Sequence, residues 1–172
     1  MLILVSGGSA SGKSRFAEGL IAASPHPRRV YLATLEVYDG ESEARVARHR
    51  AMRAGKGFET VECPRAVPDL TVPAGCALLV EDLSNLTANE CFGGAGMAGA
   101  YGRILELIRA LDRRAALTVV VTNELFSDGV AYPAGTADYL ECLARLNRAL
   151  AGMAGQVYEV VCGIPIPWKG GA

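Results

Sequence analysis

The sequence predicts an α/β fold in which helices flank a mostly parallel sheet. Short apolar or β-branched runs alternate along the chain with longer stretches of helical spacing, which is the pattern of such folds. A glycine-rich segment, residues 7–12, joins the first apolar run to the first helical stretch. The length of 172 residues suits a domain with its own apolar core, so we expect residues 1–172 to form a single domain.

The individual elements follow from the same patterns. The chain opens on an apolar run that predicts a buried first strand, and later strands are short runs of the same kind. The predicted strands are Leu2–Ser6, Val30–Thr34, Phe58–Glu62, Ala77–Glu81, Thr118–Thr122 and Val157–Cys162. The predicted helices are Lys13–Ala23, Glu41–Ala54, Ser84–Glu90, Ala98–Arg113 and Ala137–Met153. Residues 92–102 are glycine-rich and form either a lid or a simple connection.

Composition narrows the functional classes. No uncharged apolar run approaches the roughly 20 residues that a membrane-spanning helix needs, so we expect a cytoplasmic protein without membrane insertion. A net charge of -1 argues against a surface that coats nucleic acid, and we expect no nucleic-acid partner. The five cysteines show no metal-binding or disulfide spacing, so we expect them to be reduced and mostly packed.

A phosphate-binding motif lies between the first strand and the first helix. Gly7, four further residues, then Gly12, Lys13 and Ser14 match G-x-x-x-x-G-K-[ST] in the strand-to-helix context that the motif requires. Backbone N–H groups and the helix N-terminus bind phosphate oxygens in such a loop, the lysine neutralises their charge and the hydroxyl ligates Mg²⁺. The motif predicts a P-loop NTPase domain that binds a nucleoside triphosphate, but it leaves the reaction open.

Two adjacent acids follow the apolar run 76–80. Glu81 lies at the end of a predicted buried strand, where a carboxylate reaches a metal bound to the nucleotide. Asp82 fits that role and the role of a cap for the next helix about equally well. We therefore predict a Mg²⁺ site made by Ser14 and Glu81.

A histidine lies among basic residues in the predicted helix Glu41–Ala54. Helical spacing places Arg45, His49 and Arg53 on one face, where like charges repel unless an anion lies among them. Cations nearby disfavour protonation of the imidazole, which leaves a neutral ring nitrogen able to attack phosphorus, and the arginines would stabilise the transferred group. His49 is thus a candidate nucleophile for nucleotidyl transfer. The alternative is that His49 is a surface histidine exposed to solvent.

Six motifs in order resemble one family, the bifunctional adenosylcobinamide kinase/adenosylcobinamide-phosphate guanylyltransferases of cobalamin biosynthesis. The motifs are "LILVSGGSASGKSRFAE", "VYLAT", "RVARHRAMR" with "ETVECP", "LLVEDLSNLTANE", "VVVTNE" and "ARLNRALAGMAGQVYEVVCGIP". They extend over nearly the whole chain. We accordingly predict a P-loop NTPase domain of RecA-like type.

The resemblance implies an activity and a set of site residues. Members phosphorylate adenosylcobinamide and then transfer GMP through a histidine onto that phosphate, which gives adenosylcobinamide-GDP. His49 and Lys13 are the implied catalytic residues, and the cofactors are GTP, or ATP for the kinase step, and Mg²⁺. A homotrimer and a corrinoid substrate are also implied. The implied nucleotide contacts are Gly7, Gly8, Ser9, Ala10, Ser11, Gly12, Lys13, Ser14, Ala33, Thr34, Leu35, Arg50, Ala51, Met52, Arg53, Glu62 and Glu81.

Two other functions fit the phosphate loop. A P-loop small-molecule kinase would need no covalent intermediate, and His49 would then be only a surface residue. A nucleotide-dependent switch would use triphosphate occupancy to order the glycine-rich residues 93–102 and would turn over slowly or not at all. The arginines around His49 favour the covalent enzyme over both.

Overall fold

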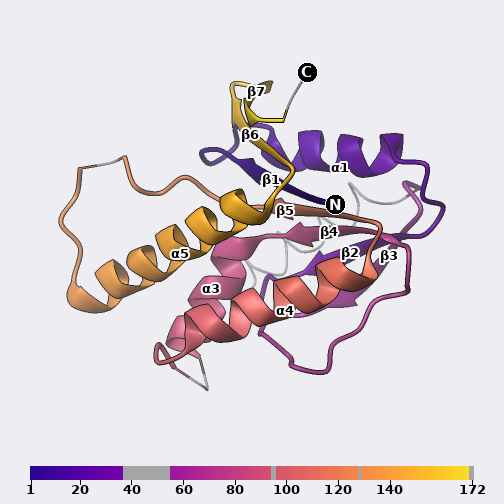
Figure 1. The fold of residues 1–172 in the computed structure, drawn as a ribbon. Coiled ribbons are helices and arrows are strands. Elements are labelled where there is room, and N and C mark those ends of the chain that lie inside the picture. Colours follow the sequence, from indigo (N-terminus) through magenta and orange to yellow (C-terminus); the bar gives the residue numbers. More distant parts are fainter. Residues whose placement is uncertain (37–54, 94–95, 128, 171–172) are drawn as a thin grey trace.

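The structure is built on one twisted sheet (Figure 1). The computed structural model describes residues 1–36, 55–93, 96–127 and 129–170. In this part of the chain the sheet has seven strands in the order β3-β2-β4-β5-β1-β6-β7. Its strands are β1 (Leu2–Ser6), β2 (Arg29–Ala33), β3 (Phe58–Glu62), β4 (Ala77–Glu81), β5 (Leu117–Val121), β6 (Gln156–Val161) and β7 (Ile164–Lys169). Its helices are α1 (Lys13–Ala23), α3 (Leu83–Phe92), α4 (Ala100–Arg114) and α5 (Ala134–Met153).

Six of these strands run parallel, so their carboxyl ends meet at one edge of the sheet. β1 lies between β5 and β6, with Val5 opposite Val121 on one side and Tyr158 on the other. The loop after β1 therefore begins in the interior of the sheet, where neighbouring strands hold it from both sides. Ligands of open α/β sheets bind at this kind of position.

The helices cover both faces of the sheet. β1 alternates strictly, because Leu2 and Leu4 join the core under α3, α4 and α5, while Ile3 and Val5 join the core under α1. The larger core includes fully buried leucines and isoleucines from all three helices: Leu86, Ile104, Ile108, Leu143, Leu146 and Leu150. Burial on both faces explains why β1, β4 and β5 are apolar runs rather than alternating ones.

Most predicted elements are present with small shifts in their ends. β2 and β5 each begin and end one residue before the prediction, and α5 begins directly after Pro133, three residues earlier than predicted. α3 is longer than predicted at both ends and begins after its cap, Asp82. The predicted helix Glu41–Ala54 lies outside the described residues.

The strand β7 was not predicted. It pairs antiparallel with β6, with Ile164 opposite Val161, and all six of its residues are exposed. Pro165 and Pro167 conceal it in the sequence, because proline lacks a backbone N–H and is found only at the edges of sheets. β7 is such an edge strand.

The cysteines are as expected from the sequence. All five are free thiols, of which four are buried and one, Cys162, is exposed in the turn between β6 and β7. Burial raises the pKa of Cys63 to about 11, so this thiol stays protonated at neutral pH. No helix in the described ranges is long and apolar enough to cross a membrane.

Candidate nucleotide-binding site

The phosphate loop, residues 7–14, leaves β1 and enters α1 at the carboxyl edge of the sheet. A Cβ atom at Gly7 would come within 2.6 Å of both the Ser11 hydroxyl and the Val160 carbonyl oxygen, so no larger residue fits there. Gly12 caps α1 in the left-handed region, with φ of 94°, and its absent Cβ lets Gly163 approach the loop. The two glycines of the motif are thus required by the geometry of the loop.

Neighbouring segments hold this loop in place. The Glu124 N–H donates to the Gly7 carbonyl at 3.1 Å, and the Gly163 N–H donates to the Ser11 carbonyl at 2.8 Å. Lys13 is 8% exposed, and its Nζ donates to the Gly8 carbonyl at 3.1 Å. A phosphate in the loop would give this ammonium a charged acceptor, which forms a stronger hydrogen bond than a carbonyl does.

The Ser14 hydroxyl meets Glu81 across the sheet. Ser14 Oγ donates to Glu81 Oε1 at 2.5 Å, although 67 residues separate them in sequence. The other carboxylate oxygen, Oε2, is buried and has no hydrogen-bond partner among the described residues. Burial raises the pKa of Glu81 to about 8, the bond from Ser14 opposes that shift, and the nearby Asp82 adds to it. An unsatisfied buried carboxylate oxygen beside a phosphate loop favours a bound cation.

These two side chains fit Mg²⁺. The ion prefers oxygen ligands and is usually held by one or two protein groups together with substrate phosphates and water. In the described ranges no three His, Cys, Asp or Glu side chains gather into a complete metal site, so the nucleotide would supply the remaining ligands.

Asp82 has a structural role. Its carboxylate caps α3 by accepting from the Asn85 N–H at 2.7 Å, and it also accepts from the side-chain amides of Asn85 at 3.2 Å and Asn123 at 3.4 Å. Burial raises its pKa, and the bond from the Asn85 N–H opposes the shift. Of the two functions that the sequence allowed for Asp82, the structure supports helix capping.

The segment after β2 is fixed by a buried network. Thr34 is fully buried, and its hydroxyl accepts from the Asp82 N–H at 2.7 Å and donates to the Asp82 carbonyl at 2.8 Å. Asn89, from α3, donates to the carbonyls of Thr34 at 2.9 Å and Pro64 at 2.8 Å. Sequence reasoning did not identify Asn89, because a single polar residue within a helical pattern gives no sign of its partner.

The expected contacts Ala33 and Glu62 share one row with Glu81. In register, Ala33 lies between Glu62 of β3 and Glu81 of β4, so all three residues lie near the carboxyl edge of the sheet. Ala33 is buried, Leu35 is half-buried and Glu62 is exposed. Of the loop residues, Gly8, Ser9 and Ala10 are exposed, which leaves this side of the loop open to a ligand.

The predicted nucleophile His49 and the predicted contacts Arg50, Ala51, Met52 and Arg53 lie outside the described residues. The flanking segments are anchored at opposite edges of the sheet. Glu36, beyond the carboxyl end of β2, accepts from Arg65 at 3.1 Å, whereas Lys56, just before β3, forms an ion pair with Glu18 of α1.

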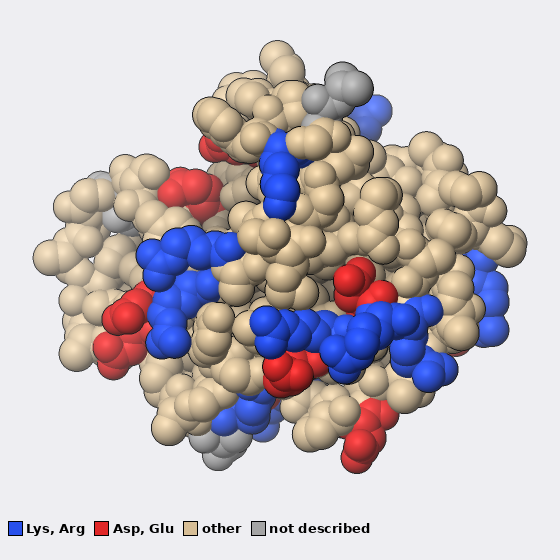
Figure 2. Space-filling model, in the orientation of Figure 1, with Lys and Arg blue, Asp and Glu red and all other residues tan. Residues whose placement is uncertain are grey.

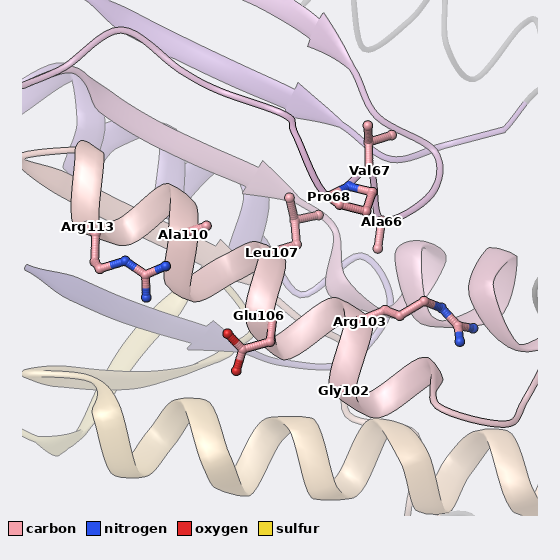
Figure 3. A pocket seen from close by; sticks show the side chains of 9 residues that line it. All are labelled: Ala66, Val67, Pro68, Gly102, Arg103, Glu106, Leu107, Ala110 and Arg113. Atoms are coloured by element: carbon pink, nitrogen blue, oxygen red, sulfur yellow. The ribbon is translucent and has the colours of Figure 1, made fainter.

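Two hollows lie beside α4, and neither is lined by a residue of the phosphate loop. The first, of about 480 Å³, lies between α4 and residues 66–68, with Glu106 and Arg113 on its rim (Figure 3). The second, of about 360 Å³, lies between α4 and α5 and is lined in part by Asp138, Glu141 and Arg145. Figure 2 shows acidic and basic side chains interspersed on the face that α4 and α5 form.

The glycine-rich segment 92–102 is tied down where it is described. Arg103 donates from two guanidinium nitrogens to the carbonyls of Gly96 and Ala98, each at 2.8 Å. Gly99 caps α4 in the left-handed region, with φ of 79°. In its described part the segment connects α3 to α4. Of the two predicted roles, these hydrogen bonds favour a simple connection over a lid.

Comparison with known proteins gives a consistent result. The family model of cobinamide kinase / cobinamide phosphate guanyltransferase, named CobU, matches residues 3–168. The bifunctional adenosylcobalamin biosynthesis protein CobU of Salmonella typhimurium is 34% identical over 184 residues, which covers 98% of this chain and 100% of that protein. The CobU protein of Escherichia coli is 33% identical with the same coverage, and CobP of Pseudomonas aeruginosa is 33% identical over 97% of this chain.

Solved structures confirm the fold. An ATPase from a bacterial type III secretion system superposes with a TM-score of 0.56 at 12% identity, covering 92% of this chain and 50% of its own. The flagellar accessory protein FlaH of Methanocaldococcus jannaschii superposes with a TM-score of 0.50 at 10% identity, and the match covers 99% of this chain and 80% of FlaH. With the mostly parallel sheet, these likenesses confirm the predicted α/β fold of P-loop NTPases of RecA-like type.

Proposed function

Since the chain belongs to the cobinamide kinase / cobinamide phosphate guanyltransferase family, we propose that it phosphorylates adenosylcobinamide and then guanylylates the product through His49. The substrates are a corrinoid and a nucleoside triphosphate, and the final product is adenosylcobinamide-GDP with release of pyrophosphate. The observation that carries the proposal is the contact between Ser14 and Glu81 at the phosphate loop, where the second Glu81 oxygen has no partner in the part of the chain that the structure describes.

The described residues account for triphosphate binding. The backbone N–H groups of the loop and the N-terminus of α1 bind phosphate oxygens, and Lys13 neutralises charge on the outer phosphates. Ser14 and Glu81 would hold Mg²⁺, which supplies charge neutralisation on the phosphates when it is bound. In the kinase step the same loop presents the γ-phosphate to the hydroxyl of the corrinoid.

The guanylyl transfer rests on the sequence around His49. A neutral ring nitrogen attacks the α-phosphorus of GTP, an N–P bond forms and pyrophosphate leaves with the electrons of the broken P–O bond. The phosphate of the corrinoid then attacks the same phosphorus, a new P–O bond forms and the imidazole leaves. Arg45 and Arg53, which share a helical face with His49 in the predicted helix, would stabilise the charge on the transferred group.

The same proposal includes the setting of the enzyme. Relatives with this family's name act in adenosylcobalamin biosynthesis, and we infer a cytoplasmic homotrimer that does not bind nucleic acid. GTP serves the guanylyl transfer, and either ATP or GTP serves the kinase step. Sedimentation of the purified chain tests the trimer directly.

The deciding experiment is incubation with Mg²⁺ and GTP labelled at the α-phosphate, followed by denaturation. We expect protein-bound label that survives alkali and is lost in acid, as a phosphoramidate is. His49→Ala should abolish the label, whereas His26→Ala, which removes the chain's other histidine, should retain it. A folded wild-type chain that binds GTP but takes up no label would contradict the covalent mechanism and favour a kinase without a covalent intermediate.

A further inference from the structure

The loop between β5 and α5, residues 123–133, begins beside the phosphate loop. The Glu124 N–H donates to the Gly7 carbonyl at 3.1 Å, and the Asn123 N–H donates to Ser84 Oγ at 3.0 Å. From there the chain extends away from the sheet before α5 begins (Figure 1). A molecule that contacts this loop can therefore place one end at the phosphates.

The described part of the loop exposes several apolar side chains. The exposed fractions are 37% for Leu125, 43% for Phe126, 58% for Val130 and 40% for Tyr132. Apolar side chains grouped in this way mark a binding surface more often than isolated ones do.

Two contacts give this surface a defined shape. Glu124 Oε1 accepts from the Phe126 N–H at 2.9 Å and from Ser127 Oγ at 3.0 Å, so the start of the loop is a tight turn that exposes Phe126. Phe92, at the end of α3, is 61% exposed, and its ring lies 5.9 Å from that of Tyr139 on α5. Aromatic rings thus lie on two elements, the loop and the end of α3.

The charge of the segment is one-sided. Residues 122–144 contain no lysine or arginine, and their charged residues are all acidic: Glu124, Asp128, Asp138 and Glu141. A cobalt(III) corrinoid with an adenosyl ligand carries net positive charge, has a broad apolar macrocycle and bears amides at its rim. An acidic segment with exposed rings complements both its charge and its apolar faces.

We propose that residues 124–127 and 129–132, together with Phe92, form the surface that holds the corrin macrocycle while its hydroxyl reaches the phosphate loop; this inference rests on the proposed function. The two hollows beside α4 are less suitable sites for the corrin macrocycle, because no residue of the phosphate loop lines either of them. A second copy of the chain could occupy the same apolar surface, and the sedimentation measurement below distinguishes that case.

The test measures adenosylcobinamide binding by equilibrium dialysis with detection of corrinoid absorbance. We expect the double substitution Phe92→Ala and Phe126→Ala to raise the Kd at least tenfold and to leave labelling of His49 by GTP unchanged. Trp168→Ala, which removes a more exposed aromatic ring from β7, should bind as the wild type does.

Three results would overturn the inference. The first is an unchanged Kd in the double variant, and the second is an equal loss in Trp168→Ala. The third is a smaller sedimenting mass of the double variant, because the surface would then join copies of the chain. The proposed function fails separately, since a wild-type chain that takes no label from GTP contradicts it whatever the corrinoid Kd is.

Discussion

Glu81 and Glu90 are both buried carboxylates, at 8% and 4% exposure, yet their surroundings differ completely. Glu90 on α3 has a partner for each oxygen: Oε1 accepts from the Ala66 N–H at 2.8 Å, and Oε2 accepts from Arg103 Nε at 2.6 Å. In the described part of the chain, Glu81 at the end of β4 has one hydrogen-bond partner, Ser14, and its other oxygen has none.

This difference separates a carboxylate whose partners are complete from one that we propose to hold a ligand. Glu90 joins α3, α4 and the segment after β3, and its charge is balanced within the protein. Glu81 carries an incomplete set of partners at the edge of the sheet where the phosphate loop lies, which costs stability unless a ligand completes the set. Burial alone therefore does not distinguish the two acids, whereas the partners that the described residues supply do.

The largest expected effect that distinguishes Glu81 from Glu90 is on the rate of catalysis. Glu81→Gln keeps the size and the hydrogen bond from Ser14 but removes the charge, so labelling by GTP with Mg²⁺ should slow about 100-fold or more. The free energy of unfolding without ligands should stay equal near pH 7, where folded Glu81 keeps its proton, and should rise above pH 8, where the wild type holds a buried charge. Initial labelling rates and urea unfolding measure the two quantities, and unchanged labelling would remove Glu81 from the metal site.

The next effect is on stability. Glu90→Gln removes the charge that Arg103 faces, and the free energy of unfolding should fall by about 2 kcal/mol. Labelling by GTP should persist. Glu106→Gln is the matched control, because its pair with Arg109 is exposed and should contribute less than about 1 kcal/mol. Equal losses in the two variants would contradict the structural role assigned to Glu90.

Counted per pH unit, the smallest effect is the dependence of stability on pH. Folded Glu81, with a pKa near 8, keeps its proton at pH values where the unfolded chain, with a pKa near 4.5, has lost it. The folded state binds more protons in that interval, so the free energy of unfolding falls as pH rises from about 5 to 8, by up to about 1.4 kcal/mol per pH unit. Urea unfolding without Mg²⁺ and nucleotide should show this slope in the wild type and a smaller slope in Glu81→Gln. A slope that persists unchanged in the variant would contradict it.

The sequence predicts the phosphate-loop side of the molecule well, because local rules determine it. The predicted bounds of β1, α1, β3 and β4 agree with the structure. For β1 and β4 the reason is that an apolar run ends at a glycine-rich or an acidic segment. Glu81 was predicted as a metal ligand from its position at a strand end, and its contact with Ser14 supports that hypothesis.

The polar network behind the site was not predictable in this way. Asn89 and Arg103 bind carbonyls or carboxylates that are far away in sequence, and one sequence does not show such pairings. Glu90 and Glu81 look alike as acids in apolar surroundings, so only the structure tells them apart. β7 was missed for a related reason, because its prolines argue against a strand unless the order of the sheet is known.

The prolines of β7 also affect how the sheet ends. Pro165 and Pro167 have no N–H, so β7 lacks two backbone donors and cannot form a complete ladder with another strand. At the opposite end, β3 carries Glu59 and Glu62, whose charges oppose docking of a further strand. Both margins of the sheet thus resist strand addition, which protects the folded protein from aggregating edge to edge.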